Sequence, residues 1–239
     1  MSSRLSAPIL AVLVAGCGSS PAVWYGYVVD DPVAVGNTTT PLADGELFAV
    51  DLDGTPLTGV SQPEGAPAGY WEMRLDVDIP VALRVEGPNH VPMVWRAQTP
   101  STNAELLSGY LFARDAAVAS VVLDDLLGDG ASVGFVDGDD AALWGQPGDP
   151  EAWAGATLTA EDGEGNVHAV SPFTIADSGE AVPAGPDDAV QLFLASGLAP
   201  GQVRFEVRLP DGTTAETVWP ARGGDMLSAP LLRPSRVTL

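Results

Sequence analysis

The chain has 239 residues, of which 32 are acidic and 10 are basic, and its formal net charge is −22. This negative charge argues against a nucleic-acid partner, because phosphates are bound by basic residues. It also argues against electrostatic binding to anionic lipid headgroups through a cluster of basic residues. The hydrophobic fraction of 46% is normal for a globular protein, so the chain is not a disordered acidic tail.

Residues 1–16 have the features of a secretory signal peptide. A short n-region ends at Arg4, and the apolar run "LSAPILAVLVAG" follows it. This run is shorter than the roughly 20 apolar residues that a spanning helix needs. An ordinary signal peptide is one interpretation, but the next residue is Cys17, the only cysteine of the chain.

The order Leu-Val-Ala-Gly-Cys at residues 13–17 resembles the lipobox of bacterial lipoproteins. The resemblance implies that the peptide is cut before Cys17 and that its thiol carries a diacylglycerol. The mature chain would then begin at Cys17, contain no disulfide and be held to a membrane by lipid. Gly18, where inner-membrane lipoproteins have Asp, favours the outer membrane in an envelope with two membranes.

Most of the remaining sequence predicts β-strands. Short runs rich in β-branched and aromatic residues alternate with Gly, Pro, Asn and Asp, which is typical of a β-sandwich or barrel. The predicted strands are 26–30, 46–51, 70–77, 81–87 and 91–97, then 156–161, 166–171, 189–195, 202–209 and 214–219.

One segment between these two groups predicts a helix instead. An apolar stripe at helical spacing begins at Ala119 and ends at Leu127. Asp115 is a plausible N-cap and Gly128 a plausible C-terminal stop. We expect a helix over Asp115–Leu127 that joins two halves and docks its stripe on a sheet.

The two halves share four sequence blocks in the same order, which predicts a tandem duplication. The matching blocks are 26–28 with 134–136, 42–61 with 153–171, 81–95 with 203–219, and 107–112 with 227–232. The last residues of the third block, Trp95 and Trp219, are therefore expected to be buried at matching strand positions.

Each copy resembles the carboxypeptidase regulatory-like domain, a transthyretin-like β-sandwich. The resemblance rests on Gly26–Val28, Asp44-Gly45-Glu46, Gly69-Tyr70 and Ile79-Pro80-Val81 in the first copy, and on Gly134–Val136, Gly155-Ala156 and Ala199–Val203 in the second. It implies a non-catalytic module that is common in surface lipoproteins. The predicted organisation is a signal peptide (1–16), a first sandwich (17–113), a linker helix (114–129) and a second sandwich (130–239).

The residues that catalysis needs are scarce in this sequence. The only histidines are His90 and His168, both in or beside predicted hairpin turns. The sequence contains no H-E-x-x-H, G-x-S-x-G or phosphate-binding motif. We therefore expect no catalytic residue, no metal site and no cofactor.

Two weaker signals keep a ligand-binding alternative open. Asp137, Asp139 and Asp140 could contribute to a calcium site, although they lack the EF-hand order and more simply form a solvated acidic face. Trp144 and Trp153 flank a Gly/Pro-rich loop and could expose an aromatic patch to sugars; the alternative is that they anchor the loop.

The leading hypothesis is a lipid-anchored, non-enzymatic envelope protein that acts as a scaffold or adhesion module. Its expected partners are the membrane, through the lipid on Cys17, and an envelope protein or glycan. The alternative is a glycan- or calcium-binding surface lipoprotein.

Overall fold

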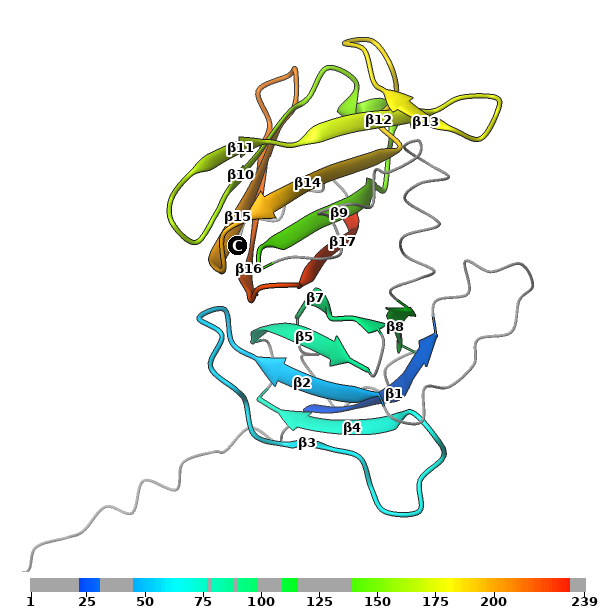
Figure 1. Ribbon diagram of the computed structural model, residues 1–239, viewed down its shortest axis with the longest axis vertical. Helices are drawn as coiled ribbons and strands as arrows, with labels where there is room; N and C mark the ends of the chain where they lie inside the picture. The colour runs from blue at the N-terminus through cyan, green and yellow to red at the C-terminus, as the bar shows by residue number, and fades with distance from the viewer. Residues whose placement is uncertain are drawn as a thin grey trace, which may run out of the picture.

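The computed structural model describes residues 22–30, 45–76, 79–87, 90–98, 109–115 and 139–232. Within these ranges the chain forms strands and a single 3-10 turn, η1 (Glu151–Trp153), so the predicted all-β class is confirmed. Below, the described residues up to 115 are called the first half and those from 139 the second half (Figure 1).

The first half contains eight strands among its described residues. They are β1 (Ala22–Asp30), β2 (Glu46–Val50), β3 (Val60–Ser61), β4 (Tyr70–Leu75), β5 (Pro80–Glu86), β6 (His90–Val91), β7 (Met93–Gln98) and β8 (Gly109–Asp115). The alternating runs predicted β1, β2, β4, β5 and β7 to within a few residues. Asp115, the predicted helix N-cap, is instead the last residue of β8, and residues 116–127 of the predicted helix lie outside the described ranges.

The second half contains nine strands. They are β9 (Ala141–Pro147), β10 (Thr157–Glu161), β11 (Val167–Ala169), β12 (Ser171–Ile175), β13 (Ala181–Pro183), β14 (Leu192–Leu198), β15 (Gly201–Arg208), β16 (Thr214–Ala221) and β17 (Met226–Leu232). β15 shows why the alternation is informative, because Val203, Phe205 and Val207 are buried while their neighbours in the strand face outward or are only partly covered.

The strand pairing of the first half recurs in the second. β1 pairs antiparallel with β4 and parallel with β8, and β9 pairs in the same way with β14 and β17. β5 lies antiparallel between β2 and β7, as β15 lies between β10 and β16. β9 therefore takes the place of β1 in this pairing, and residues 134–136, the predicted match of 26–28, lie outside the described ranges.

The register of the recurring strands corrects one predicted equivalence. Val81 lies opposite Ala97, and Val203 lies opposite Trp219. Trp219 thus corresponds to Ala97, and Trp95 is displaced from it by two residues along equivalent strands. Trp219 is fully buried, whereas Trp95 is only half-buried.

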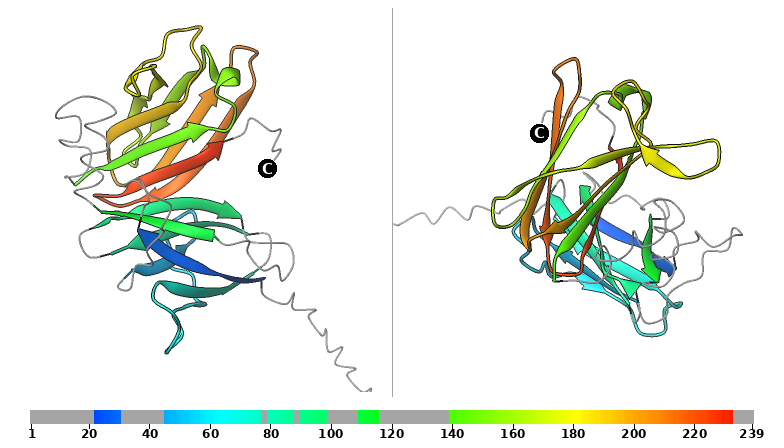
Figure 2. Two further views of the ribbon diagram at one scale, coloured as in Figure 1. Left: turned by 90° about the vertical axis from the view of Figure 1, so that its right-hand side faces the viewer. Right: turned by 45° about the horizontal axis from the view of Figure 1, so that its top comes forward.

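The sheets do not divide cleanly between the halves. The strand orders are β3-β4-β1-β8-β6, β11-β10-β15-β16 and β13-β12-β14-β9-β17-β7-β5-β2. The last of these is a continuous sheet with five strands of the second half and three of the first. The left view of Figure 2 shows β17, in red, between β9 and the strands of the first half.

The largest core lies between the two sheets of the second half. The rings of Trp153, Phe193 and Phe205 stack at its centre, with 4.9 Å between the centroids of Phe193 and Phe205 and 5.5 Å between those of Trp153 and Phe193. These residues come from η1, β14 and β15, so the core ties both sheets to the loop before β10. A second core in the first half contains Trp71 and Met73 of β4.

Candidate functional site

The predicted lipidation site and part of the predicted calcium cluster lie outside the described residues. This holds for Cys17 and Asp137. Asp139 and Asp140 are described and both are exposed. In the described ranges no group of three or more His, Cys, Asp or Glu side chains is arranged to hold a metal ion.

The junction between the halves combines strand pairing, apolar packing and a buried ion pair. It begins with a parallel strand pair, in which Met226, Leu227 and Ser228 of β17 lie opposite residues 93–95 of β7. The N–H of Met226 donates to the carbonyl of Pro92 at 2.8 Å. Because β17 also pairs with β9, the backbone hydrogen bonds run through the junction without a break.

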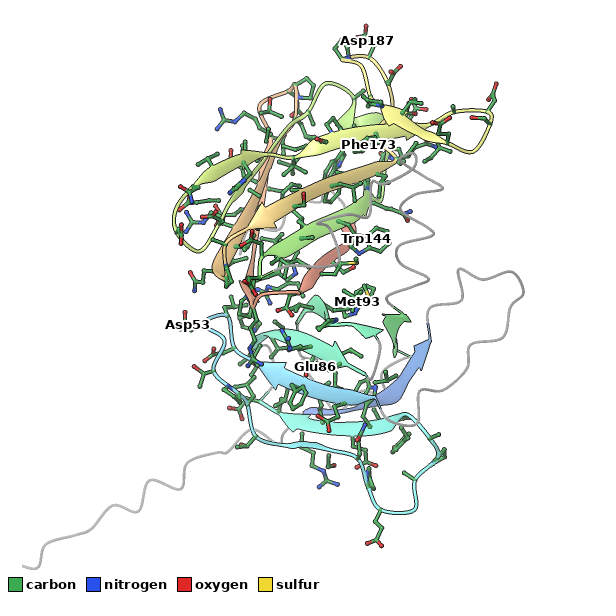
Figure 3. The ribbon with its side chains drawn as sticks, in the orientation of Figure 1. Asp53, Glu86, Met93, Trp144, Phe173 and Asp187 are labelled. Atoms are coloured by element: carbon green, nitrogen blue, oxygen red, sulfur yellow. The ribbon has the colours of Figure 1, made fainter. Side chains whose placement is uncertain are left out.

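An apolar cluster covers one face of this strand pair. Met226 packs there with Val91 and Met93, and the rings of Trp95 and Trp144 lie against them. Figure 3 shows Trp144 on the second half above Met93 on the first. The cluster removes apolar surface of both halves from water, which stabilises their contact.

A cavity of about 250 Å³ lies at the same junction. It is smaller than the roughly 300–1,000 Å³ of typical small-molecule sites. Its walls come from both halves: Val50, Asp53, Gly54, Arg84 and Val94 on one side, and Gly201, Gln202, Pro220, Ala221 and Arg222 on the other.

One lining residue of this cavity, Arg84, belongs to a buried ion pair. The guanidinium of Arg84, on β5, donates to the carboxylate of Asp225, in the turn before β17. Asp225 is 1% exposed and Arg84 is 7% exposed. The carboxylate of Asp225 also accepts the N–H of Arg222 at 2.8 Å, and Glu86 binds Arg84 from its own strand.

The charges in and behind the cavity nearly balance. Burial raises the pKa of Asp225 to about 6, more than the attraction of Arg84 lowers it. Arg84 is already bound by two carboxylates, and the lining also contains one further acidic residue, Asp53, and one further basic residue, Arg222. The lining thus holds charges of both signs, and its polar residues Arg84 and Gln202 also bind residues across the junction.

A second polar contact crosses the junction near the surface. The side-chain amide of Gln202, on β15, donates to the carbonyl of Leu52 at 3.2 Å and to the carboxylate of Asp53 at 2.8 Å. Both acceptors lie in the turn after β2. Figure 3 shows Asp53 on this turn, where it reaches the second half.

The side chain of His168 has a defined partner. Its Nε2 lies 2.7 Å from the carboxylate of Asp162, which is 4% exposed and also accepts the N–H groups of Glu164 and Asn166. These hydrogen bonds, with His168 first, hold the pKa of Asp162 far below its usual range.

The surroundings of Asp162 indicate a structural role for this pair. Asp51 accepts the N–H groups of Asp53 and Thr55 in the equivalent turn of the first half, which has no histidine. A Cβ at Gly163 would lie 1.9 Å from the carbonyl oxygen of Pro200, so only glycine fits there. The Asp162 turn is therefore a tightly packed hairpin turn, and the other histidine, His90, is the first residue of β6.

The aromatic patch considered for the ligand-binding alternative does not form. Trp153 is fully buried in the core of the second half, where it stacks on Phe193 and Phe205. Trp144 is half-buried at the junction, between the cluster of Met93 and the apolar residues of β14. A sugar-stacking surface made of Trp144 and Trp153 is thus excluded, and Trp153 anchors its loop.

No helix in the described residues is long and apolar enough to cross a membrane. Comparison with protein-family models gives no match for the chain, and comparison with curated proteins gives none either.

Proposed function

We propose that this protein is a lipid-anchored, non-enzymatic component of a cell envelope that acts as a scaffold or adhesion module. Its two tandem halves are transthyretin-like β-sandwiches, and Cys17 carries the lipid. The observation that supports the scaffold role is the junction, where a strand pair, a buried ion pair and an apolar cluster join the two halves.

The repeat and its joint support a mechanical role rather than a chemical one. In a chain that holds two modules by a continuous sheet, the distance and angle between their outer surfaces are fixed. Inter-domain contacts that are small and polar usually permit motion, whereas this junction combines main-chain pairing with buried apolar side chains. A spacer or scaffold needs this fixed geometry.

Lipid attachment is tested by replacing Cys17 with Ser in cells labelled with radioactive palmitate. The wild-type chain takes up label and stays with the membranes, and Cys17→Ser does neither. Label on the variant would refute the anchor. The full chain with Cys17→Ser, used as bait in an envelope extract, then tests the scaffold function: a specific envelope protein retained on it supports the proposal.

Ligand binding is the alternative function. Carbohydrate binding was based on an exposed surface formed by Trp144 and Trp153, and this surface is absent because Trp153 is buried. Its calcium form is tested by calorimetry of the Cys17→Ser chain with Ca²⁺. A stoichiometric heat at micromolar concentrations would replace the scaffold function by a calcium-dependent one.

A further inference from the structure

The two halves use opposite faces of the eight-stranded sheet that they share. Directly opposite residues of paired strands point to the same face of a sheet, and successive residues of one strand point to opposite faces. Leu227 of β17 points into the core between this sheet and the four-stranded sheet. Leu83 of β5 lies opposite Trp95, and Trp95 lies opposite Ser228, the neighbour of Leu227. Leu83 therefore points to the other face, where it packs with Trp71 of the five-stranded sheet.

On this other face, the strands of the second half carry a continuous row of apolar side chains. Trp144 of β9 lies opposite both Ser228 of β17 and Leu194 of β14, so the three residues share the face. The row, called the outer face below, consists of Trp144, Phe173, Ile175, Ala181, Leu192 and Leu194. Figure 3 shows Met93, Trp144 and Phe173 following one another from the first half into the second.

The outer face is buried, although its cluster contains no side chain from another described layer. Leu192 is 3% exposed, Leu194 is 6% exposed and Ala181 is 5% exposed. A sheet buries an apolar face by packing it against a second layer of structure. The cluster, however, contains residues of β9, β12, β13 and β14 only, and all four strands belong to the shared sheet. The burial thus requires a layer that the described ranges do not supply.

We propose that residues 116–127 form an amphipathic helix whose apolar stripe packs on the outer face. The sequence predicts a helix in this segment, and the stripe consists of Ala119, Val122, Leu123, Leu126 and Leu127. The partner of the outer face is therefore a segment of the same chain. The inference goes beyond the proposed scaffold function and needs neither the lipid anchor nor an external partner.

The segment leaves and re-enters the described structure at suitable places. It leaves β8 after Asp115, and β8 belongs to the five-stranded sheet, which packs on the same face of the shared sheet. It re-enters at Asp139, directly before β9, the strand that carries Trp144. A helix of residues 116–127 is about 18 Å long. Four neighbouring strands span about 14 Å, so the stripe is long enough to cross β17, β9, β14 and β12.

The other long segments outside the described ranges suit the outer face less well. Residues 31–44 and 99–108 both leave and re-enter the first half. Residues 233–239 contain two arginines and no apolar stripe, and burying an unpaired charge is costly. Residues 1–21 contain the predicted signal peptide. Residues 116–127 combine an apolar stripe with ends on both halves.

Packing on the outer face also places the stripe beside the junction. Trp144 belongs to the outer face and also packs on the cluster of Met93 and Met226, which joins the halves. A helix over Trp144 removes further apolar surface from water at this point, which strengthens the joint.

The first test is a matched pair of charge substitutions in the full chain with Cys17→Ser. Val122 belongs to the stripe, whereas Val121 lies on the opposite side of the predicted helix. Hydroxyl-radical footprinting, read by mass spectrometry, measures the access of solvent to Trp144 and Phe173. Val122→Asp should raise the labelling of both rings several-fold, because a carboxylate cannot stay in an apolar contact. Val121→Asp should leave the labelling at the level of the parent chain.

The same labelling in the two variants, whether raised or unchanged, would overturn the proposal. The exposed Val167 serves as the internal reference, since its labelling should be equal in every chain.

The second test maps the contact directly and does not depend on the folding of Val122→Asp. Ser120→Cys, beside the stripe, is combined with Cys17→Ser and carries a benzophenone on its thiol, the only one in that chain. Illumination should join this position to peptides of β9, β12 or β14 within the same molecule. An outcome without a cross-link to these strands, or with cross-links only between two molecules, would reject the segment as the partner of the outer face.

Discussion

Arg84 and Asp225 are 141 residues apart in the sequence and form a buried ion pair that links the two halves. Asp225 also accepts the N–H of Arg222 in the turn before β17. The ion pair therefore helps to position β17, the strand that pairs with β7. The free energy needed to remove two charges from water offsets much of the attraction between them, so the net contribution of a buried pair to stability is small. Removing one partner destabilises the protein by more than this net contribution, because the other charge stays buried without a partner.

Loss of one member of this pair is expected to destabilise the protein strongly. Arg84→Met leaves the carboxylate of Asp225 buried without its cation and should lower the free energy of unfolding by about 3 kcal/mol at pH 8. Guanidinium denaturation measures the change. The double variant Arg84→Met with Asp225→Leu should regain most of it, because no buried charge remains.

The matched control is Arg208→Met. Arg208 binds Glu206 on the same strand, but its side chain is 64% exposed, so its loss should cost about 0–1 kcal/mol. Equal losses for Arg84→Met and Arg208→Met would show that the junction pair does not join the halves.

The raised pKa of Asp225 gives stability a distinctive pH dependence. The folded carboxyl has a pKa of about 6 against an ordinary value of 3.8, so the folded state binds this proton more tightly than the unfolded state. This contribution is present below pH 4 and is lost as the pH rises to 6. The stability of the wild type minus that of Asp225→Asn should fall over this window by on the order of 2–3 kcal/mol and stay level above pH 7.

Much of the fold was predictable because its signals are local. The alternation in β15 and the Asp-Gly turns act over a few residues, and the repeated blocks around Val81 and Val203 predicted strands that do pair alike. β9 escaped prediction because it is buried almost throughout and shows no clear alternation.

The junction could not be predicted from local sequence patterns. The β7–β17 register and the contact of Arg84 with Asp225 depend on where distant strands meet, and no local pattern carries that information. Trp153 shows the same limit. Its Gly- and Pro-rich neighbours left open whether Trp153 is exposed or anchors its loop, and the choice is made by Phe193 and Phe205 from later strands, which bury it.

The contribution of Asp162 to stability should depend on pH in the opposite direction from that of Asp225. Its pKa is lowered by His168 and by the turn N–H groups, so its contribution is present above the unfolded pKa and is lost as the pH falls through the folded value. Thermal melts from pH 5 to pH 2 should show a smaller loss for Asp162→Asn than for the wild type. A His168→Ala chain should fall between them, since His168 is the largest cause of the shift; identical curves would contradict this role.

Trp219 tests whether the two halves unfold as one unit. Two separate sandwiches would show two transitions, but the continuous sheet and the Arg84–Asp225 pair predict a single one. Trp219 is fully buried, so Trp219→Ala should cost about 3–5 kcal/mol and lower the melting of the whole molecule together. Hydrogen exchange measured by mass spectrometry reports on both halves in one experiment. In Trp219→Ala, the amides of β5 in the first half should lose protection together with those of β15 in the second. The control, Val167→Ala, changes a side chain that is 69% exposed and should leave both halves protected. If β5 keeps its protection in Trp219→Ala while β15 loses it, the halves are independent and the junction is too weak to make them a stiff unit.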